Sequence, residues 1–183
     1  MTHTAKTLTA ALLLLLLLTA PGHAADPENT LYLDLDSGRV VIETRPDLAP
    51  AHVARIKELV RAGFYDGVVF HRVIEGFMAQ TGDPTGTGRG GSGQTLRAEF
   101  SREPFVRGTV GMARSQSEHS GDSQFFICFA PASYLDGQYT VWGKVTSGME
   151  FVDRISKGQG SSGMVRNPDR IIRMQVAADV AAK

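Results

Sequence analysis

The chain has 183 residues, and its 19 lysine and arginine residues balance 19 aspartate and glutamate residues, so the formal net charge is zero. That balance argues against a nucleic-acid-binding protein and against a polybasic membrane-surface protein, since both need an excess of positive charge. The single cysteine excludes an intrachain disulfide and a multi-cysteine zinc site. A hydrophobic content of 42% is typical of a globular protein, and the length suits one domain.

Residues 1–24 have the pattern of a cleavable secretory signal peptide. Lys6 and the amino terminus are positive, the stretch from Leu8 to Ala20 is apolar, and small residues precede a cut after Ala24. The apolar stretch is about 13 residues long, whereas a helix that spans a bilayer needs about 20. A permanent N-terminal membrane anchor is the alternative. The signal-peptide pattern predicts an exported, periplasmic protein, with secretion as the alternative. Its single mature domain is predicted to cover 25–183.

The first elements of the mature chain are predicted from alternation and helical spacing. Apolar residues alternate on both sides of the turn residues Ser37 and Gly38, which predicts a β-hairpin. Pro50 opens a stretch with apolar residues at helical spacing, and Gly63 provides its stop, so we predict a helix between them.

Further strands are predicted, in chain order, at 68–74, 108–112, 124–129, 139–145 and 170–176, with a short helix at 149–156. Short strands between glycine-rich turns favour a β-barrel or sandwich over a layered α/β fold.

Three weaker patterns point to other classes of protein. The stretch from Gly86 to Gly91 fits the G-x-G-x-x-G pattern of dinucleotide sites, but no helical spacing follows it, so an ordered surface loop is the better interpretation. The histidines lack metal-ligand spacing, and we expect neither a metal nor a cofactor. Several serines lie near His119 and Asp122, so a small exported hydrolase is an alternative. The nucleophile motif of common hydrolases is missing, which argues against that alternative.

The predicted strand 68–74 is more informative, because it is apolar on both faces and yet carries Arg72. A buried guanidinium needs a carboxylate partner or a cleft. A structural ion pair with Glu75 or Asp83 is one explanation. Gln80 and Gln124 also interrupt apolar segments, and each of these amides needs hydrogen-bond partners if it is buried.

Five motifs follow one another along the chain: Phe70-His71-Arg72, Gly76 to Asp83, Gly111-Met112-Ala113, Ser123 to Ile127 and Leu135-Asp136-Gly137. Together they resemble the cyclophilin family of peptidyl-prolyl cis-trans isomerases, from about Thr30 to Val176. The resemblance implies a mainly β fold, a closed eight-stranded antiparallel β-barrel capped by two α-helices. It also implies isomerisation of X-Pro bonds in peptides and folding proteins. With the predicted signal peptide, we expect this activity to assist protein folding in the cell envelope.

The same resemblance implies roles for individual residues. Arg72 corresponds to the family's catalytic arginine, and Gln80 is expected to assist it. The residues expected to bind substrate are Phe77, Met78, Ala113, Arg114, Gln124, Phe126, Tyr134, Leu135 and Tyr139. Of these, Phe77, Met78, Phe126 and Leu135 correspond to walls of the proline pocket. Gln80 and Gln124 correspond to groups that hold the peptide backbone, and Ala113 and Arg114 to the segment that pairs with it.

Three positions depart from the pattern of many eukaryotic members. Tyr134 stands where a tryptophan helps to bind cyclosporin, so we expect cyclosporin to bind weakly. Tyr139 replaces a histidine, and Arg114 replaces an asparagine. We expect a monomer that binds X-Pro peptides and unfolded proteins, with no nucleic-acid partner and no membrane insertion after signal cleavage. A peptide-binding or chaperone module without catalysis, and a structural domain without a site, are the alternatives.

Overall fold

The computed structural model describes residues 26–181, so the predicted signal peptide at 1–24 lies outside the described residues. Its eight strands are β1 (Thr30–Leu35), β2 (Gly38–Thr44), β3 (Arg72–Ile74), β4 (Met78–Thr81), β5 (Thr109–Met112), β6 (Phe125–Cys128), β7 (Val141–Ser147) and β8 (Arg173–Val176). The helices are α1 (Pro50–Arg61), α2 (Met149–Asp153) and α3 (Ala177–Ala181), with short 3-10 turns η1 (Pro27–Asn29) and η2 (Ser133–Leu135). Among residues 26–181, no helix is long and apolar enough to cross a membrane.

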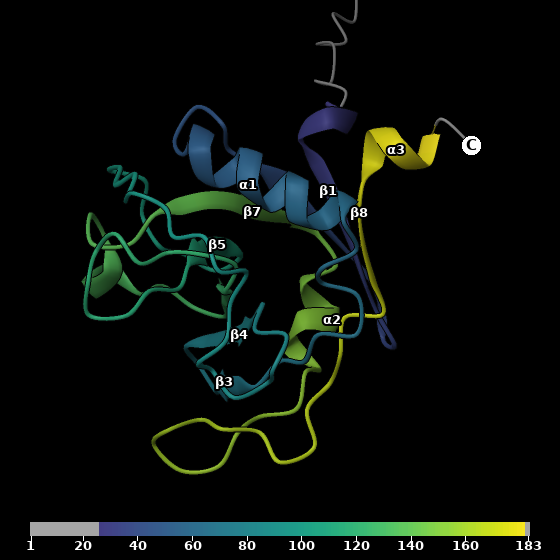
Figure 1. Ribbon diagram of the computed structural model, residues 1–183. Coiled ribbons are helices and arrows are strands. Elements are labelled where there is room, and N and C mark those ends of the chain that lie inside the picture. The colour runs from purple at the N-terminus through teal and green to yellow at the C-terminus, as the bar shows by residue number, and fades with distance from the viewer. Residues whose placement is uncertain (1–25, 182–183) are drawn as a thin grey trace, which may run out of the picture.

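All strand pairs are antiparallel, in the order β3-β4-β6-β5-β7-β2-β1-β8. Figure 1 shows that the sheet curls, with α1 at its upper end and α2 below α1 in that view. Helix α1 contacts β7 and β8, while α2 contacts β2. The first hairpin and the helix from Pro50 are confirmed, because each had a strong local pattern of apolar residues.

The curled sheet does not close into a barrel. Within residues 26–181, β3 and β8 stand at the two ends of the strand order and are not paired with each other. Neighbouring segments meet instead: the Gly67 amide donates to the Ile171 carbonyl at 2.7 Å, and the Phe70 amide donates to the Asp169 carbonyl at 2.9 Å. Pro168 lies in this stretch and has no amide hydrogen to donate to a regular ladder. The prediction of a closed eight-stranded barrel is therefore wrong, and the architecture is a curled half-barrel.

The strand boundaries also differ from the predictions in places. Strand β3 begins at Arg72 rather than at 68, because residues 68–71 lie against irregular chain and make a single isolated bridge among the described residues, between Val69 and Arg170. Strand β4 had no predicted counterpart, because Phe77 and Met78 read as general core residues. Strand β7 starts later than expected and runs to Ser147.

Strand β6 divides the interior into two apolar clusters, because successive side chains point to opposite faces. Phe125 lies in the main core, where its ring meets Tyr65 at a centroid distance of 5.5 Å and Trp142 at 5.4 Å. Phe126 belongs to the smaller second cluster. The main core packs the sheet against α1. The second cluster lies on the other face of β6 and is separate from this core.

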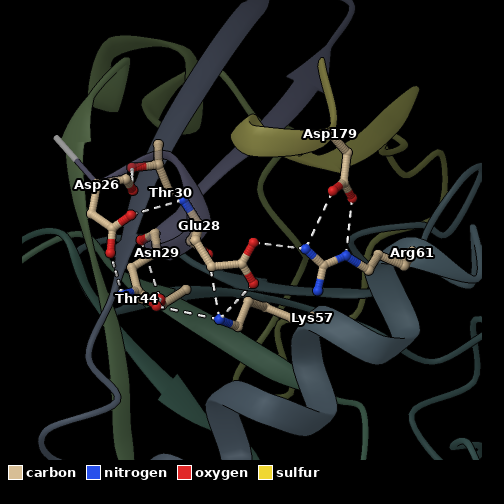
Figure 2. A network of polar contacts seen from close by, with 8 residues as sticks. All are labelled: Asp26, Glu28, Asn29, Thr30, Thr44, Lys57, Arg61 and Asp179. Atoms are coloured by element: carbon tan, nitrogen blue, oxygen red, sulfur yellow. Dashed lines mark hydrogen bonds and ion pairs between the residues drawn. The ribbon is translucent and has the colours of Figure 1, made fainter. Parts of the chain in front are cut away.

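A polar network fastens both ends of the described chain to α1 (Figure 2). The Arg61 guanidinium donates to the Glu28 carboxylate at 2.8 Å and to Asp179 at 3.0 and 3.2 Å. The Lys57 ammonium donates to the Glu28 carboxylate at 3.1 Å and to the Asn29 side chain at 3.3 Å. Turn η1 and helix α3 are thus joined through one helix.

Replacing Arg61 by alanine is expected to lower the free energy of unfolding by about 1 kcal/mol. A half-exposed ion pair contributes less than that, but Arg61 pairs with two carboxylates, Glu28 and Asp179. Urea unfolding at low and high salt measures the effect, which shrinks in about 1 M salt as the charges are screened. Arg97→Ala is the control, since that exposed side chain makes no ion pair within the described chain. Equal losses in both variants would contradict the role of the network.

Candidate active site

A row of side chains crosses four neighbouring strands. In the strand register Arg72 lies opposite Gln80, Gln80 lies opposite Phe126, and Phe126 lies opposite Gly111. Residues that face each other across antiparallel strands project to the same side of the sheet. Segments far apart in the sequence therefore place a guanidinium, an amide and an aromatic ring on one surface.

The second apolar cluster lies at the end of this row. Its buried members include three predicted pocket residues, Met78, Phe126 and Leu135, and Phe77, Ala113 and Tyr139 pack against it half-buried. The Tyr134 ring packs against the Phe77 ring at a centroid distance of 5.5 Å but is 61% exposed. The structure thus brings the predicted pocket residues together, with Tyr134 at the outer rim.

Phe105 is a member of this cluster that the sequence did not reveal. Its buried ring stacks on Phe126 with 5.7 Å between centroids, while Tyr139 meets Phe126 edge-on at 5.9 Å. Gly111 makes room for this stack, because a Cβ there would lie 2.6 Å from both phenyl rings. Phe105 lies outside any strand or helix, so no periodic pattern could have pointed to it.

Arg72 is held by two neutral acceptors. Its Nε donates to the Ser162 carbonyl at 3.0 Å, and its Nη1 donates to Gln80 Oε1 at 3.2 Å. Within residues 26–181 no carboxylate pairs with Arg72, so the structure does not support the ion pair with Glu75 or Asp83. Of the five guanidinium N–H groups, these contacts use two and leave the others free to bind a ligand.

The two glutamines extend the polar row away from Arg72. Gln80 Nε2 donates to Gln124 Oε1 at 2.9 Å, and Gln124 Nε2 donates to the carbonyls of Gly88 at 3.1 Å and Gly90 at 2.8 Å. Both amide hydrogens of Gln124 are thus occupied. In this arrangement Gln124 orients Gln80 and holds the loop from Gly86 to Gly91, hereafter the glycine loop. The expected contact of Gln124 with a peptide backbone stays a prediction.

A backbone edge lies beside the row. The Ala113 amide donates to the Gln124 carbonyl at 2.9 Å, while the hydrogen bonds found within residues 26–181 leave the Ala113 carbonyl and the Arg114 amide unpaired. Unpaired strand-like backbone of this kind can bind an extended peptide. A fixed cation, an apolar pocket and a free backbone edge therefore adjoin one another.

The whole domain matches a known family. The family model described as "Cyclophilin type peptidyl-prolyl cis-trans isomerase/CLD" matches residues 30–176. The chain belongs to the cyclophilin family. It is a peptidyl-prolyl cis-trans isomerase of the cyclophilin type, an assignment that a relative at 59% identity also supports.

That relative is a "Probable peptidyl-prolyl cis-trans isomerase" of Brucella abortus (strain 2308), aligned over 85% of this chain and 86% of its own. Among solved structures, a cyclophilin from Hirschia baltica matches with a TM-score of 0.76 and 28% identity, covering 85% of this chain and 76% of that one. A Cryptosporidium parvum cyclophilin crystallised in the presence of the dipeptide Ala-Pro matches with a TM-score of 0.73 and 26% identity, covering 80% and 98%.

A cavity of about 650 Å³ adjoins the polar row of this cyclophilin. Gln80, Gln124 and the Gly88–Gly91 loop line one part of it, and Ala113 and Arg114 line another. The Arg114 guanidinium lies 4.5 Å from the centre of the Tyr139 ring and donates to the Gln138 carbonyl at 3.2 Å. Arg114 therefore braces the rim with its side chain while its amide faces the backbone edge.

Asp83 holds the glycine loop in place from beneath. Its buried carboxylate accepts hydrogen bonds from the amides of Thr85 at 2.7 Å, Thr87 at 3.0 Å and Gly88 at 2.6 Å. Burial by itself raises the pKa of Asp83, but the hydrogen bonds from Thr85 and the loop amides outweigh it and lower the pKa to about 2. The stretch from Gly86 to Gly91 is thus an ordered loop built on a charged anchor.

This anchor predicts a loss of stability in acid. Because the pKa of Asp83 is lower in the folded chain, its contribution is complete above the unfolded value near 4 and disappears as the pH falls towards about 2. We expect Asp83→Asn to reduce the free energy of unfolding by about 2 kcal/mol at pH 7. In this variant the free energy of unfolding should also depend less steeply on pH between about pH 4 and 2. Urea titrations of both proteins across this range test it, and parallel pH profiles would refute it.

Proposed function

We propose that this cyclophilin isomerises X-Pro bonds at the row formed by Arg72, Gln80 and Phe126. The observation that carries the proposal is the Arg72 guanidinium, fixed by two neutral acceptors and with N–H groups to spare beside an apolar pocket. No covalent bond breaks when a prolyl amide rotates, so a positioned donor and a pocket for the ring are sufficient.

In the proposed mechanism the proline ring enters the cluster around Phe126, with Phe77, Met78 and Leu135 as its other walls. As the amide twists, resonance is lost and the prolyl nitrogen regains its lone pair, to which Arg72 donates. This hydrogen bond is stronger in the twisted state than in either planar state, which is the condition for catalysis. Gln80 keeps the guanidinium aligned.

The backbone of the substrate is proposed to lie along Ala113 and Arg114. Their unpaired carbonyl and amide support this assignment. The similar Cryptosporidium protein was crystallised in the presence of the dipeptide Ala-Pro, which supports a proline-containing peptide as the ligand. NMR exchange spectroscopy on a short Ala-Pro peptide tests the function, since catalysis brings cis and trans signals into exchange. If the peptide shifts the amide resonances of the protein but its own cis and trans signals do not exchange, the protein is a binding module, which is the alternative.

We further propose that the protein acts on unfolded and folding proteins in the periplasm after removal of residues 1–24. The positive start, the apolar stretch and the small residues before the cut support export. N-terminal sequencing of the full chain expressed in a Gram-negative host tests this proposal. The expected product begins at Ala25 in the periplasmic fraction, whereas an intact leader in the cytosolic fraction would contradict it.

A further inference from the structure

The segment Ser162–Val165, hereafter the edge segment, lies along the outer edge of β3. The Val73 amide donates to the Gly163 carbonyl at 2.7 Å, and the Val165 amide donates to the His71 carbonyl at 3.0 Å. Strand β4 occupies the opposite edge of β3. In Figure 1 the edge segment belongs to the long loop at the bottom of the view, next to the β3 label. It is therefore registered against the strand that carries Arg72.

The same segment contacts the guanidinium itself. Arg72 Nε donates to the Ser162 carbonyl at 3.0 Å, at one end of the guanidinium plane, and Nη1 donates to Gln80 at the other end, at 3.2 Å. A single anchor would leave the flexible arginine free to turn about its last bonds. Two anchors on different nitrogens define the plane of the group and the direction of the remaining N–H groups.

We propose that the edge segment is a positioning element for Arg72, acting through the Ser162 carbonyl; this inference rests on the proposed function of Arg72. A donor that already points to the developing charge needs no reorganisation when the amide twists. The edge segment carries no reacting group. Its contribution is to hold Arg72 in the orientation that the transition state requires.

Gly163 is the residue that allows the edge segment to lie so close. Its φ of +69° favours glycine, and a Cβ at this position would lie 2.4 Å from Ile74 Cγ1 and 3.1 Å from the Val73 carbonyl oxygen. Because Ile74 is fixed within β3, a larger residue must move the edge segment outward, and the Ser162 carbonyl moves with it. Gly160 offers a matched control: its φ is +65°, but a Cβ there would meet nothing within 4 Å.

The test compares Gly163→Ala with Gly160→Ala in the full chain. Both variants carry the same backbone strain, and only Gly163→Ala displaces the edge segment. We expect kcat to fall about 10- to 100-fold in Gly163→Ala, with KM within about threefold, because misplacing a catalytic group slows the chemical step more than it weakens binding. Gly160→Ala is expected to stay within about twofold of the wild type in both constants. Equal effects of the two variants would overturn the proposal.

A double-mutant cycle separates positioning from other causes. If the edge segment acts through Arg72, Gly163→Ala lowers kcat/KM no further in an Arg72→Ala background. An equal additional loss in that background would show that the segment acts independently, and would overturn the inference while leaving the proposed function intact. Full activity of Arg72→Ala alone would instead remove the proposed function itself.

A spectroscopic measurement keeps the proposal testable even if Gly163→Ala does not fold. In the wild type, the Nε–H of Arg72 should exchange with water more slowly than that of Arg89, whose side chain has no hydrogen-bond partner among residues 26–181. In folded Gly163→Ala this protection should be lost. Rapid exchange at Arg72 in the wild type would contradict the Ser162 contact on which the inference depends.

Discussion

Arg72→Ala is expected to lower kcat/KM for an X-Pro peptide by about 10- to 100-fold while the protein stays folded. A charge-assisted hydrogen bond contributes about 1.5–3 kcal/mol net, and each 1.36 kcal/mol is about a tenfold change in rate. Loss of the Arg72 donor to the twisted prolyl nitrogen therefore accounts for one to two orders of magnitude. NMR exchange or a coupled peptide assay measures it.

This effect is only part of the catalysis. Rotation of a prolyl amide has a barrier of about 18–20 kcal/mol, which corresponds to roughly 0.01 turnovers per second at the upper end. A turnover near 1,000 per second would require a reduction of about 7 kcal/mol, more than one hydrogen bond supplies. In the proposed mechanism, the pocket around Phe126 and the backbone edge at Ala113 provide the remainder.

The stability of the Arg72 variants distinguishes catalysis from folding. Arg72 is half-buried and bonded to neutral acceptors, so its removal should change the melting temperature by only a few degrees. Arg72→Lys keeps the charge but cannot bond both Gln80 and Ser162 from one planar group, and intermediate activity is expected. Near-normal turnover in folded Arg72→Ala would remove the assignment.

Phe126→Ala is expected to raise KM strongly, with kcat/KM lower by about 10- to 100-fold. The ring stacks on Phe105 and meets Tyr139 edge-on, so its loss opens one wall of the proposed proline pocket. Burial of an apolar group of this size is worth about 1.5–3 kcal/mol, which sets the range. The variant should also lose about 3 kcal/mol of stability through the cavity that it leaves.

Phe125→Ala is the matched control, because Phe125 is the preceding residue on the same strand and faces the main core. Its ring contacts Tyr65 and Trp142, so alanine should destabilise the fold at least as much as at Phe126. Measured in the cold, where both variants are folded, Phe125→Ala should keep kcat/KM within a few-fold of the wild type. Equal losses of activity at the two positions would show that strand β6 acts through stability alone.

Several elements could be predicted because their signals are local. In β1 the buried leucines alternate with half-buried residues. Helix α1 starts at Pro50 and ends before Gly63. Such patterns follow from the period of the backbone, whatever the rest of the chain does. Strand β4 was missed because its residues Met78 to Thr81 are nearly all buried and show no alternation.

Closure of the barrel could not be decided in this way. Whether β3 meets β8 depends on how the chain between α2 and β8 folds. That stretch contains several glycines and Pro168 and shows no periodic pattern of apolar residues, so its path could not be predicted. The edge segment covers β3 there through isolated backbone contacts, so an edge that a closed barrel would pair with a strand is covered by a loop.

By itself the sequence determined the family, helices α1 and α2, most of the strands and the predicted pocket residues that the fold brings together, but not Phe105. Arg72, Gln80 and Phe126 were marked as polar or aromatic residues in specific motifs. The tertiary structure decided what holds them. Ser162 and Phe105 touch Arg72 and Phe126 from irregular segments that are distant along the chain, and such contacts arise only from the packing of the whole sheet. Backbone period and local chemistry are short-range properties, whereas the orientation of a guanidinium depends on atoms brought together by folding.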